Sequence, residues 1–198
     1  MDDDRIRAER AVAAWARVES WLGRHAPRTF ERLPPPAAQA EIDALERELD
    51  LRIPADVRAF YLVRNGTGPA SDFDWPVSRD APDPTGYFLP RGEGIGPLDK
   101  LALWFDGPVS MERREDRPDQ RYLPVTTTDP DGFYGTFTDC TPGHGYGLLG
   151  SYAEADVPSP GESTFATYLT HIADTLWAEH APRGDTAPRV TDGLLDWE

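Results

Sequence analysis

The apolar residues near the start of the chain recur at the spacing of one helical face. Between residues 6 and 22 they stand three or four positions apart, which predicts an amphipathic helix. This stripe consists of Ala11, Trp15, Val18 and Leu22. Residues 23–36 end in three consecutive prolines and read as a connector, since proline does not fit inside a helix.

A second helical pattern lies within residues 33–68. Ile42, Leu45 and Leu49 share one face of a predicted helix. Asp50, which follows them, tolerates the left-handed conformation that often ends a helix.

Another helix is predicted to begin at Pro54, because proline suits the first helical position. Asp56 stands in its first turn, where a carboxylate meets the positive end of the helix dipole. The glycine of Asn65-Gly66 ends this second helical region. The residues expected to be buried are Val57, Phe60 and Tyr61.

The second half of the chain carries β-branched and alternating positions, which predict strands. Strands are expected over residues 121–128, 133–138 and 146–152, and a shorter one over 86–90. Asp129-Pro130-Asp131-Gly132 has the composition of a turn between two of them. Helical spacing returns over residues 98–105 and 163–179, with Ser163 as the expected N-cap of the last helix.

Together these elements predict an α+β fold, in which an antiparallel or mixed β-sheet is flanked by helices in a single domain. A chain of 198 residues fits one domain of ordinary size. We expect the domain to occupy residues 1–182, including the N-terminal helix. Residues 183–198 form a C-terminal tail whose apolar residues Leu194, Leu195 and Trp197 are candidates to dock back onto it.

The formal net charge is −15, and no Lys or Arg occurs between Tyr122 and Pro182. Nucleic-acid binding through phosphates requires clustered basic residues, so nucleic acid is excluded as an expected partner. An acidic surface attracts a basic protein by long-range steering. The alternative is that the charge serves solubility alone.

The start of the chain, MDDDRIRAER, is charged and lacks the apolar core of a signal peptide. No apolar run reaches the roughly 20 residues that a membrane helix needs. A single cysteine, Cys140, excludes a disulfide within the chain. We therefore expect a cytoplasmic protein that does not bind a membrane.

Motifs for cofactors and metals fail when their context is considered. Residues 145–150 fit G-x-G-x-x-G, but no helical pattern follows, so a glycine-rich hairpin is favoured over a nucleotide site. The acids at 129, 131 and 139 lack the calcium-loop spacing. Cys140 and His144 have no second pair to complete a zinc site. No cofactor, metal or catalytic residue is predicted, although a triad of distant residues stays open.

The stretch AEIDALERELDLRIP, followed by ADVRAFYLVRNG, resembles the Smi/Knr cell-wall-assembly-regulator family of the SUKH superfamily. The resemblance continues through RYLPVTTTDPDGFYGTFTD and the helix after Ser163, so it spans about residues 15–177. One departure is Leu49-Asp50, where the family commonly has Leu-Gly. The resemblance implies a protein-binding role without catalysis: bacterial relatives are often toxin-immunity proteins, and fungal relatives are scaffolds.

We therefore expect a non-enzymatic module that binds a basic protein, with a toxin domain as one candidate, through an acidic face. Two alternatives stay open: a scaffold without a toxin link, and a hydrolase with a dispersed site. The sequence does not specify the oligomeric state. The expected protein-binding residues are Asp129, Asp131, Tyr134, Asp139, Asp72, Asp74 and Trp75.

Overall fold

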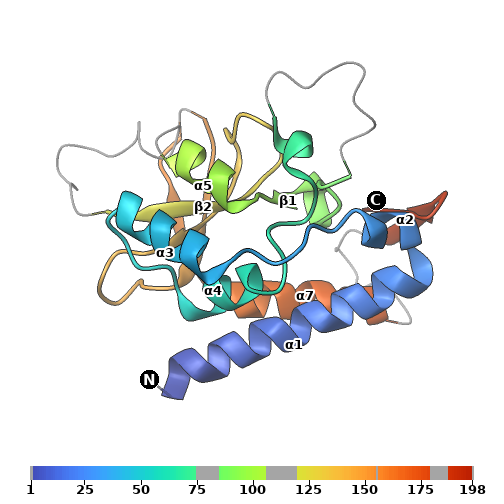
Figure 1. The fold of residues 1–198 in the computed structure, drawn as a ribbon, viewed down its shortest axis with the longest axis horizontal. Helices are drawn as coiled ribbons and strands as arrows, with labels where there is room; N and C mark the ends of the chain where they lie inside the picture. Colours follow the sequence, from blue (N-terminus) through green and yellow to red (C-terminus); the bar gives the residue numbers. More distant parts are fainter. Residues whose placement is uncertain (1, 75–84, 106–119, 155, 179–186, 198) are drawn as a thin grey trace.

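The fold is α+β, as expected: six helices flank a five-stranded antiparallel sheet in the described part of the chain (Figure 1). The computed structural model describes residues 2–74, 85–105, 120–154, 156–178 and 187–197. A separate two-stranded hairpin lies near the C-terminal end. None of the described helices is both long and apolar enough to cross a membrane.

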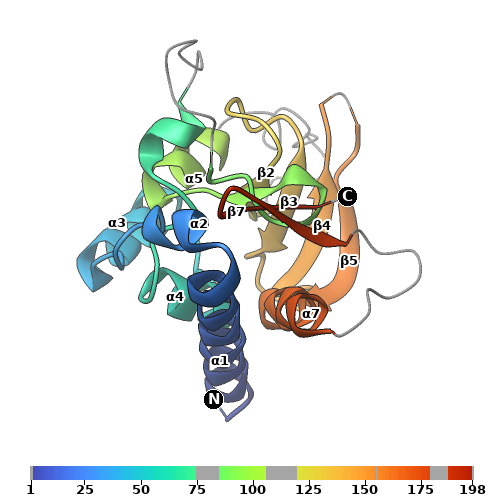
Figure 2. The same cartoon turned by 90° about the vertical axis from the view of Figure 1, so that its right-hand side faces the viewer.

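Helix α1 (Asp2–His25) runs alongside α7 (Phe165–Trp177) and also packs against α4 (Ala55–Tyr61) (Figures 1 and 2). The predicted stripe of α1 is buried throughout. The ring of Phe60 meets the rings of Trp15 and Phe165 edge to face, at centroid distances of 5.0 and 5.5 Å. These aromatic contacts join three helices that are far apart in the sequence.

Helix α3 (Gln39–Glu48) buries Ile42 and Leu45, and Asp50 adopts the expected left-handed conformation with a φ of 48°. The expected connector before it is wrong in part, since α2 (Pro27–Glu31) lies within it. Pro27 occupies the first helical position, where its fixed φ favours a helix and its missing N–H removes no bond.

The sheet is a meander in the order β1-β2-β3-β4-β5, with every neighbouring pair antiparallel. Its strands are β1 (Gly94–Ile95), β2 (Tyr122–Thr127), β3 (Gly135–Asp139), β4 (Leu148–Tyr152) and β5 (Ser159–Thr164). The three strands expected after residue 120 correspond to β2, β3 and β4.

Strand β5 was not expected, and it changes the start of the last helix. Its residues SPGEST are polar and mostly exposed, so no apolar alternation marks them. The strand runs to Thr164, whose hydroxyl accepts a hydrogen bond from the Thr167 N–H at 3.2 Å. Thr164, and not Ser163, is therefore the N-cap, and α7 begins at Phe165.

The strand expected over residues 86–90 is wrong. After the short helical turn η1 (Ala70–Phe73), the chain forms a tight loop around η2 (Pro90–Gly92), closed by a hydrogen bond from the Leu89 N–H to the Glu93 carbonyl at 2.9 Å. Arg91 has a φ of 65°, a left-handed conformation that a regular strand does not contain. Helix α5 (Leu98–Phe105) follows as predicted.

The C-terminal strands β6 (Pro188–Thr191) and β7 (Leu194–Trp197) pair with each other. The Leu195 N–H donates to the Thr29 hydroxyl at 2.9 Å, and the Trp197 indole N–H donates to the Phe88 carbonyl at 2.7 Å. Leu195 is buried. The hairpin thus packs on α2 and on the loop before η2.

The glycine-rich segment 145–150 forms a turn and the start of β4, and no helix follows Gly150 directly. Gly147 has a φ of 79°, which favours glycine. A methyl group at Gly150 would overlap the ring of Phe137 on the neighbouring strand. These glycines serve backbone conformation and packing.

Candidate functional site

The loop between β2 and β3, residues 128–134, is termed the acidic turn. The Asp129 carboxylate accepts hydrogen bonds from the N–H groups of Phe133 and Tyr134, at 3.1 and 3.2 Å. The Tyr134 carbonyl accepts from the Thr128 N–H at 3.0 Å and closes the loop. Tyr134 is 46% exposed, so this ordered turn presents an aromatic ring to solvent.

One further acid contacts the Tyr134 side chain, and another belongs to the same turn. The Tyr134 hydroxyl donates to Glu154 Oε2 at 3.4 Å. Asp131 is half-buried, and desolvation together with the neighbouring Asp129 charge raises the pKa of its carboxyl. The structure therefore brings Asp129, Asp131 and Tyr134 together as one group and adds Glu154, which sequence reasoning had not selected.

Asp139 lies at the opposite end of β3 from this group. Five residues separate it from Tyr134, which corresponds to about 16 Å along a strand. Its carboxylate accepts a hydrogen bond from the Thr141 N–H at 2.8 Å, and its carbonyl accepts from the Gly147 N–H at 2.7 Å. Asp139 is engaged in the β3–β4 turn and does not share the acidic turn.

The second predicted cluster, residues 72–75, is also divided. Asp72 is buried and accepts from the Gly86 N–H at 2.7 Å and from Arg32 at 3.2 Å, so it fixes a loop. Asp74 is exposed and pairs with Lys100 at 2.7 Å. Trp75 lies outside the described residues.

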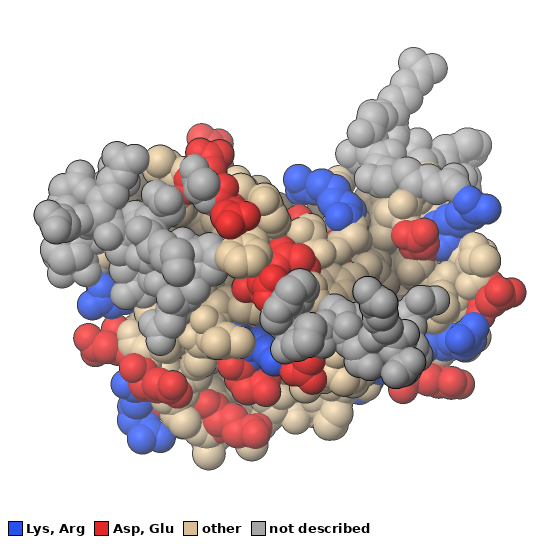
Figure 3. Space-filling view, turned by 90° about the horizontal axis from the view of Figure 1, so that it is seen from above, with Lys and Arg blue, Asp and Glu red and all other residues tan. Residues whose placement is uncertain are grey.

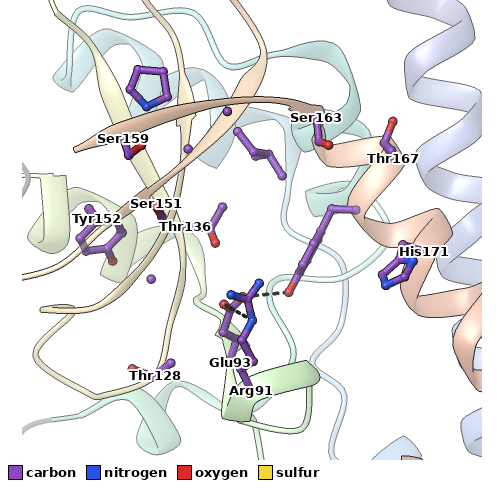
Figure 4. Close-up of a pocket in the computed structure, with 16 residues that line it drawn as sticks. Arg91, Glu93, Thr128, Thr136, Ser151, Tyr152, Ser159, Ser163, Thr167 and His171 are labelled. Atoms are coloured by element: carbon purple, nitrogen blue, oxygen red, sulfur yellow. Dashed lines mark hydrogen bonds and ion pairs between the residues drawn. The ribbon is translucent and has the colours of Figure 1, made fainter. Parts of the chain in front are cut away.

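A cleft of about 810 Å³ opens between the sheet and α7. Its floor carries a row of hydroxyl groups on directly paired positions of neighbouring strands, so they share one face of the sheet. Thr136, Ser151 and Ser159 line the cleft, and the row continues to Thr126, which is buried beyond the lining. Figure 4 shows Thr136, Ser151 and Ser159 across the cleft from Thr167 and His171 on α7. Thr128 and Gly135, at the base of the acidic turn, also line the cleft.

Glu93 lies at one end of this hydroxyl row, with its side chain only 7% exposed. Its Oε2 atom accepts hydrogen bonds from the hydroxyls of Thr126 and Tyr168, at 3.1 and 3.0 Å. Its Oε1 atom lies 3.9 Å from Arg91 Nε, and the Arg91 side chain is 78% exposed at the mouth of the cleft (Figure 4). The cleft therefore contains a buried carboxylate that is hydrogen-bonded through one oxygen.

Burial raises the pKa of two further groups near the sheet, Tyr168 and Cys140. Desolvation, and then the charge of Glu93, raises the pKa of Tyr168 well above its usual value, so its hydroxyl remains a donor. Desolvation likewise raises the pKa of the Cys140 thiol, which opposes formation of a nucleophilic thiolate. No group of three or more metal-ligating side chains occurs among residues that the structure describes.

Figure 3 shows acidic side chains spread over one face of the molecule, with basic side chains among them. The stretch without Lys or Arg includes β2 to β5 and α7, yet Arg91 reaches the mouth of the cleft from another part of the chain. The charge near the cleft therefore combines the negative groups of the acidic turn and Glu93 with the positive Arg91 at the mouth.

Residues 36–174 match the model of the SMI1 / KNR4 family (SUKH-1). The protein is also similar to a KNR4/SMI1 homolog from Yarrowia lipolytica (strain CLIB 122 / E 150), with 31% identity over 64 residues. These residues make up 32% of this chain and 9% of the relative, so the chain matches a small part of that protein. The family match contains every residue that lines the cleft. Because it covers more than half of the sequence, the chain belongs to the SMI1/KNR4 family.

Proposed function

We propose that this protein is a non-catalytic, immunity-like module that binds a basic protein and blocks its action. The observation that carries the proposal is the exposed Tyr134 ring on the acidic turn, whose backbone Asp129 holds in place. An aromatic side chain in an ordered loop can bind with little loss of conformational entropy. Aromatic residues of this kind are enriched among those that dominate binding energy.

The charges around Tyr134 have a different role in this proposal. Glu154 accepts from the Tyr134 hydroxyl, Asp131 lies in the same turn beside Asp129, and β2 to α7 contain no Lys or Arg. Such groups accelerate the encounter with a basic partner more than they strengthen the final complex. Membership of the SMI1/KNR4 family is consistent with this role, which we place in the cytoplasm.

The test begins with tagged protein used to recover a partner from its own cell lysate, followed by surface-plasmon kinetics with that partner. Asp131→Lys should slow association about threefold or more, because it reverses a steering charge. Tyr134→Ala should speed dissociation about fivefold or more, because it removes the aromatic contact. Added salt should slow association, since the Debye length is about 8 Å at 0.15 M.

Glu48→Lys, at the exposed end of α3, is the matched control for charge reversal. It makes the same change in net charge away from the acidic turn, and it should leave both rates close to those of the unmodified protein. Equal slowing by Asp131→Lys and Glu48→Lys would show that net charge alone matters. Unchanged rates for both Asp131→Lys and Tyr134→Ala would refute the acidic turn as the binding site.

A further inference from the structure

We propose that the cleft between the sheet and α7 binds an arginine side chain of the partner, whose guanidinium displaces Arg91 and pairs with Glu93. This inference rests on the proposed function and specifies the chemistry of the partner at a second contact. Three features of the cleft support it: the incomplete bonding of Glu93, the weak hold on Arg91, and the hydroxyl row.

The bonding of Glu93 is asymmetric. Both hydroxyl donors, from Thr126 and Tyr168, reach Oε2. The contact of Oε1 within the described residues is Arg91 Nε at 3.9 Å, which is too long for a hydrogen bond. A buried carboxylate is strongly stabilised by charge-assisted hydrogen bonds, so Oε1 offers a favourable position for a cationic donor.

Arg91 is poorly suited to be the cationic donor to Glu93 Oε1. Its side chain is 78% exposed, and its backbone is in a left-handed conformation within a tight loop. Exposed ion pairs contribute little to stability, because water screens them and both side chains lose conformational freedom. A cation delivered by a bound partner can therefore replace Arg91 without loss of a strong interaction.

The lining of the cleft favours a guanidinium over an ammonium group. Guanidinium is planar and carries five N–H donors, so it can bond to a carboxylate and to neighbouring acceptors at once. Thr136 and Ser151 provide hydroxyl oxygens on the floor, beside apolar surface from Leu149 and Pro160. The volume of about 810 Å³ accommodates a long side chain and its apolar stem.

The cleft also reaches the acidic turn. Thr128, the first residue of the turn, lines the cleft, and so does Gly135, which directly follows the turn. A basic partner that contacts Tyr134 is thus placed beside the cleft mouth. One bound protein would supply the aromatic contact at the turn and the arginine in the cleft.

The experiment is a nuclear magnetic resonance titration of the full, isotope-labelled chain with the capped peptide acetyl-Gly-Arg-Gly-amide. The citrulline peptide, which is close in shape but uncharged, is the matched ligand control, and the lysine peptide tests the choice of guanidinium. We expect saturable shifts of the Glu93, Thr136 and Ser151 amides with the arginine peptide. The citrulline peptide should give none, and the lysine peptide should bind more weakly.

Two variants then test the separate roles of Glu93 and Arg91 in binding the arginine peptide. Glu93→Gln should weaken arginine-peptide binding about tenfold, the loss expected for a charged hydrogen bond. Arg91→Gln should strengthen binding about threefold, because it removes the competing cation. Opposite effects of these two changes are not expected if both residues are merely structural. Glu162→Gln, an exposed acid on β5 outside the cleft lining, should have no effect.

Ser159→Trp provides a test that leaves Glu93 intact, since an indole ring at this exposed position of the cleft floor would fill the cleft and abolish binding. Thermal unfolding of each variant checks that the fold is retained. Equal binding of the citrulline or lysine peptide, or unchanged binding by Glu93→Gln, would overturn the inference. If the peptide does not bind while Asp131→Lys still slows association of the whole partner, the cleft inference fails and the proposed function stands.

Discussion

Two buried carboxylates, Asp56 and Glu93, occupy contrasting environments. Asp56 is fully buried where α1, α4 and α7 meet. Its oxygens accept from the Ala166 N–H at 3.0 Å, the Val57 N–H at 3.2 Å and Arg7 at 3.4 Å. Glu93, in contrast, is hydrogen-bonded through one oxygen and presents the other toward the cleft.

Both carboxylates are buried, so burial does not distinguish them. The number of carboxylate oxygens that accept hydrogen bonds distinguishes the structural acid, Asp56, from the candidate binding acid, Glu93. Asp56 bonds to backbone N–H groups at the starts of two helices, where a negative charge is favoured by the helix dipole. Arg7 adds a counterion and also donates to the Gly147 carbonyl at 2.8 Å. With its bonds complete, Asp56 holds elements together and has no evident capacity for a ligand.

Among the variants that test this contrast, Asp56→Ala should have the largest effect on the free energy of unfolding. It leaves Arg7 without its buried partner and removes an acceptor at the start of α7, so the free energy of unfolding should fall by about 3–5 kcal/mol. Denaturant unfolding followed by circular dichroism measures this change. Asp43→Ala, which breaks a partly exposed pair with Arg58 but leaves Arg58 paired with Glu46, should lose about 1 kcal/mol or less. Similar losses for the two variants would contradict the structural role of Asp56.

A smaller effect is expected when Glu93 is changed to Gln. The amide oxygen can still accept from Thr126 and Tyr168, and burial of a neutral group is less costly than burial of a charge. The free energy of unfolding should change by less than about 1 kcal/mol. A loss as large as that of Asp56→Ala would mean that Glu93 is a second structural acid, and the contrast would disappear.

The smallest effect on stability should come from Tyr134→Ala. The ring is exposed, and its hydroxyl donates a long hydrogen bond of 3.4 Å to Glu154. The free energy of unfolding should change by no more than about 0.5 kcal/mol, as for most surface substitutions. A strong drop in melting temperature would show that Tyr134 supports the structure of the acidic turn. A faster dissociation rate in this variant would then no longer be evidence that the ring contacts the partner.

Much of the fold was predictable because apolar periodicity marks the buried helical faces. The stripe of α1, the residues Ile42 and Leu45 of α3, and the three strands after residue 120 all follow such patterns. Strand β5 was not predictable in this way, because it is polar and lies at the edge of the sheet.

The candidate site was predictable only in part. Asp129, Asp131 and Tyr134 are close in sequence, and a turn keeps them close in space. The hydroxyl row depends on strand register, which joins residues 126 to 159, and Glu93 depends on side-chain contacts with β2 and α7. Asp56 was expected to serve its own helix, but it also bonds to α7, 110 residues later in the chain. These long-range contacts of Glu93 and Asp56 leave no local pattern in the sequence.

The ion pair between Lys100 and Asp74 has a practical consequence for chemical modification. Lys100 is the single lysine of the sequence, its side chain is 15% exposed, and its ammonium lies 2.7 Å from the carboxylate. An amine that is largely covered and held in an ion pair is poorly accessible, so reagents and enzymes that modify lysine side chains meet a shielded target. Labelling and cross-linking of this protein are better directed at its abundant carboxylates.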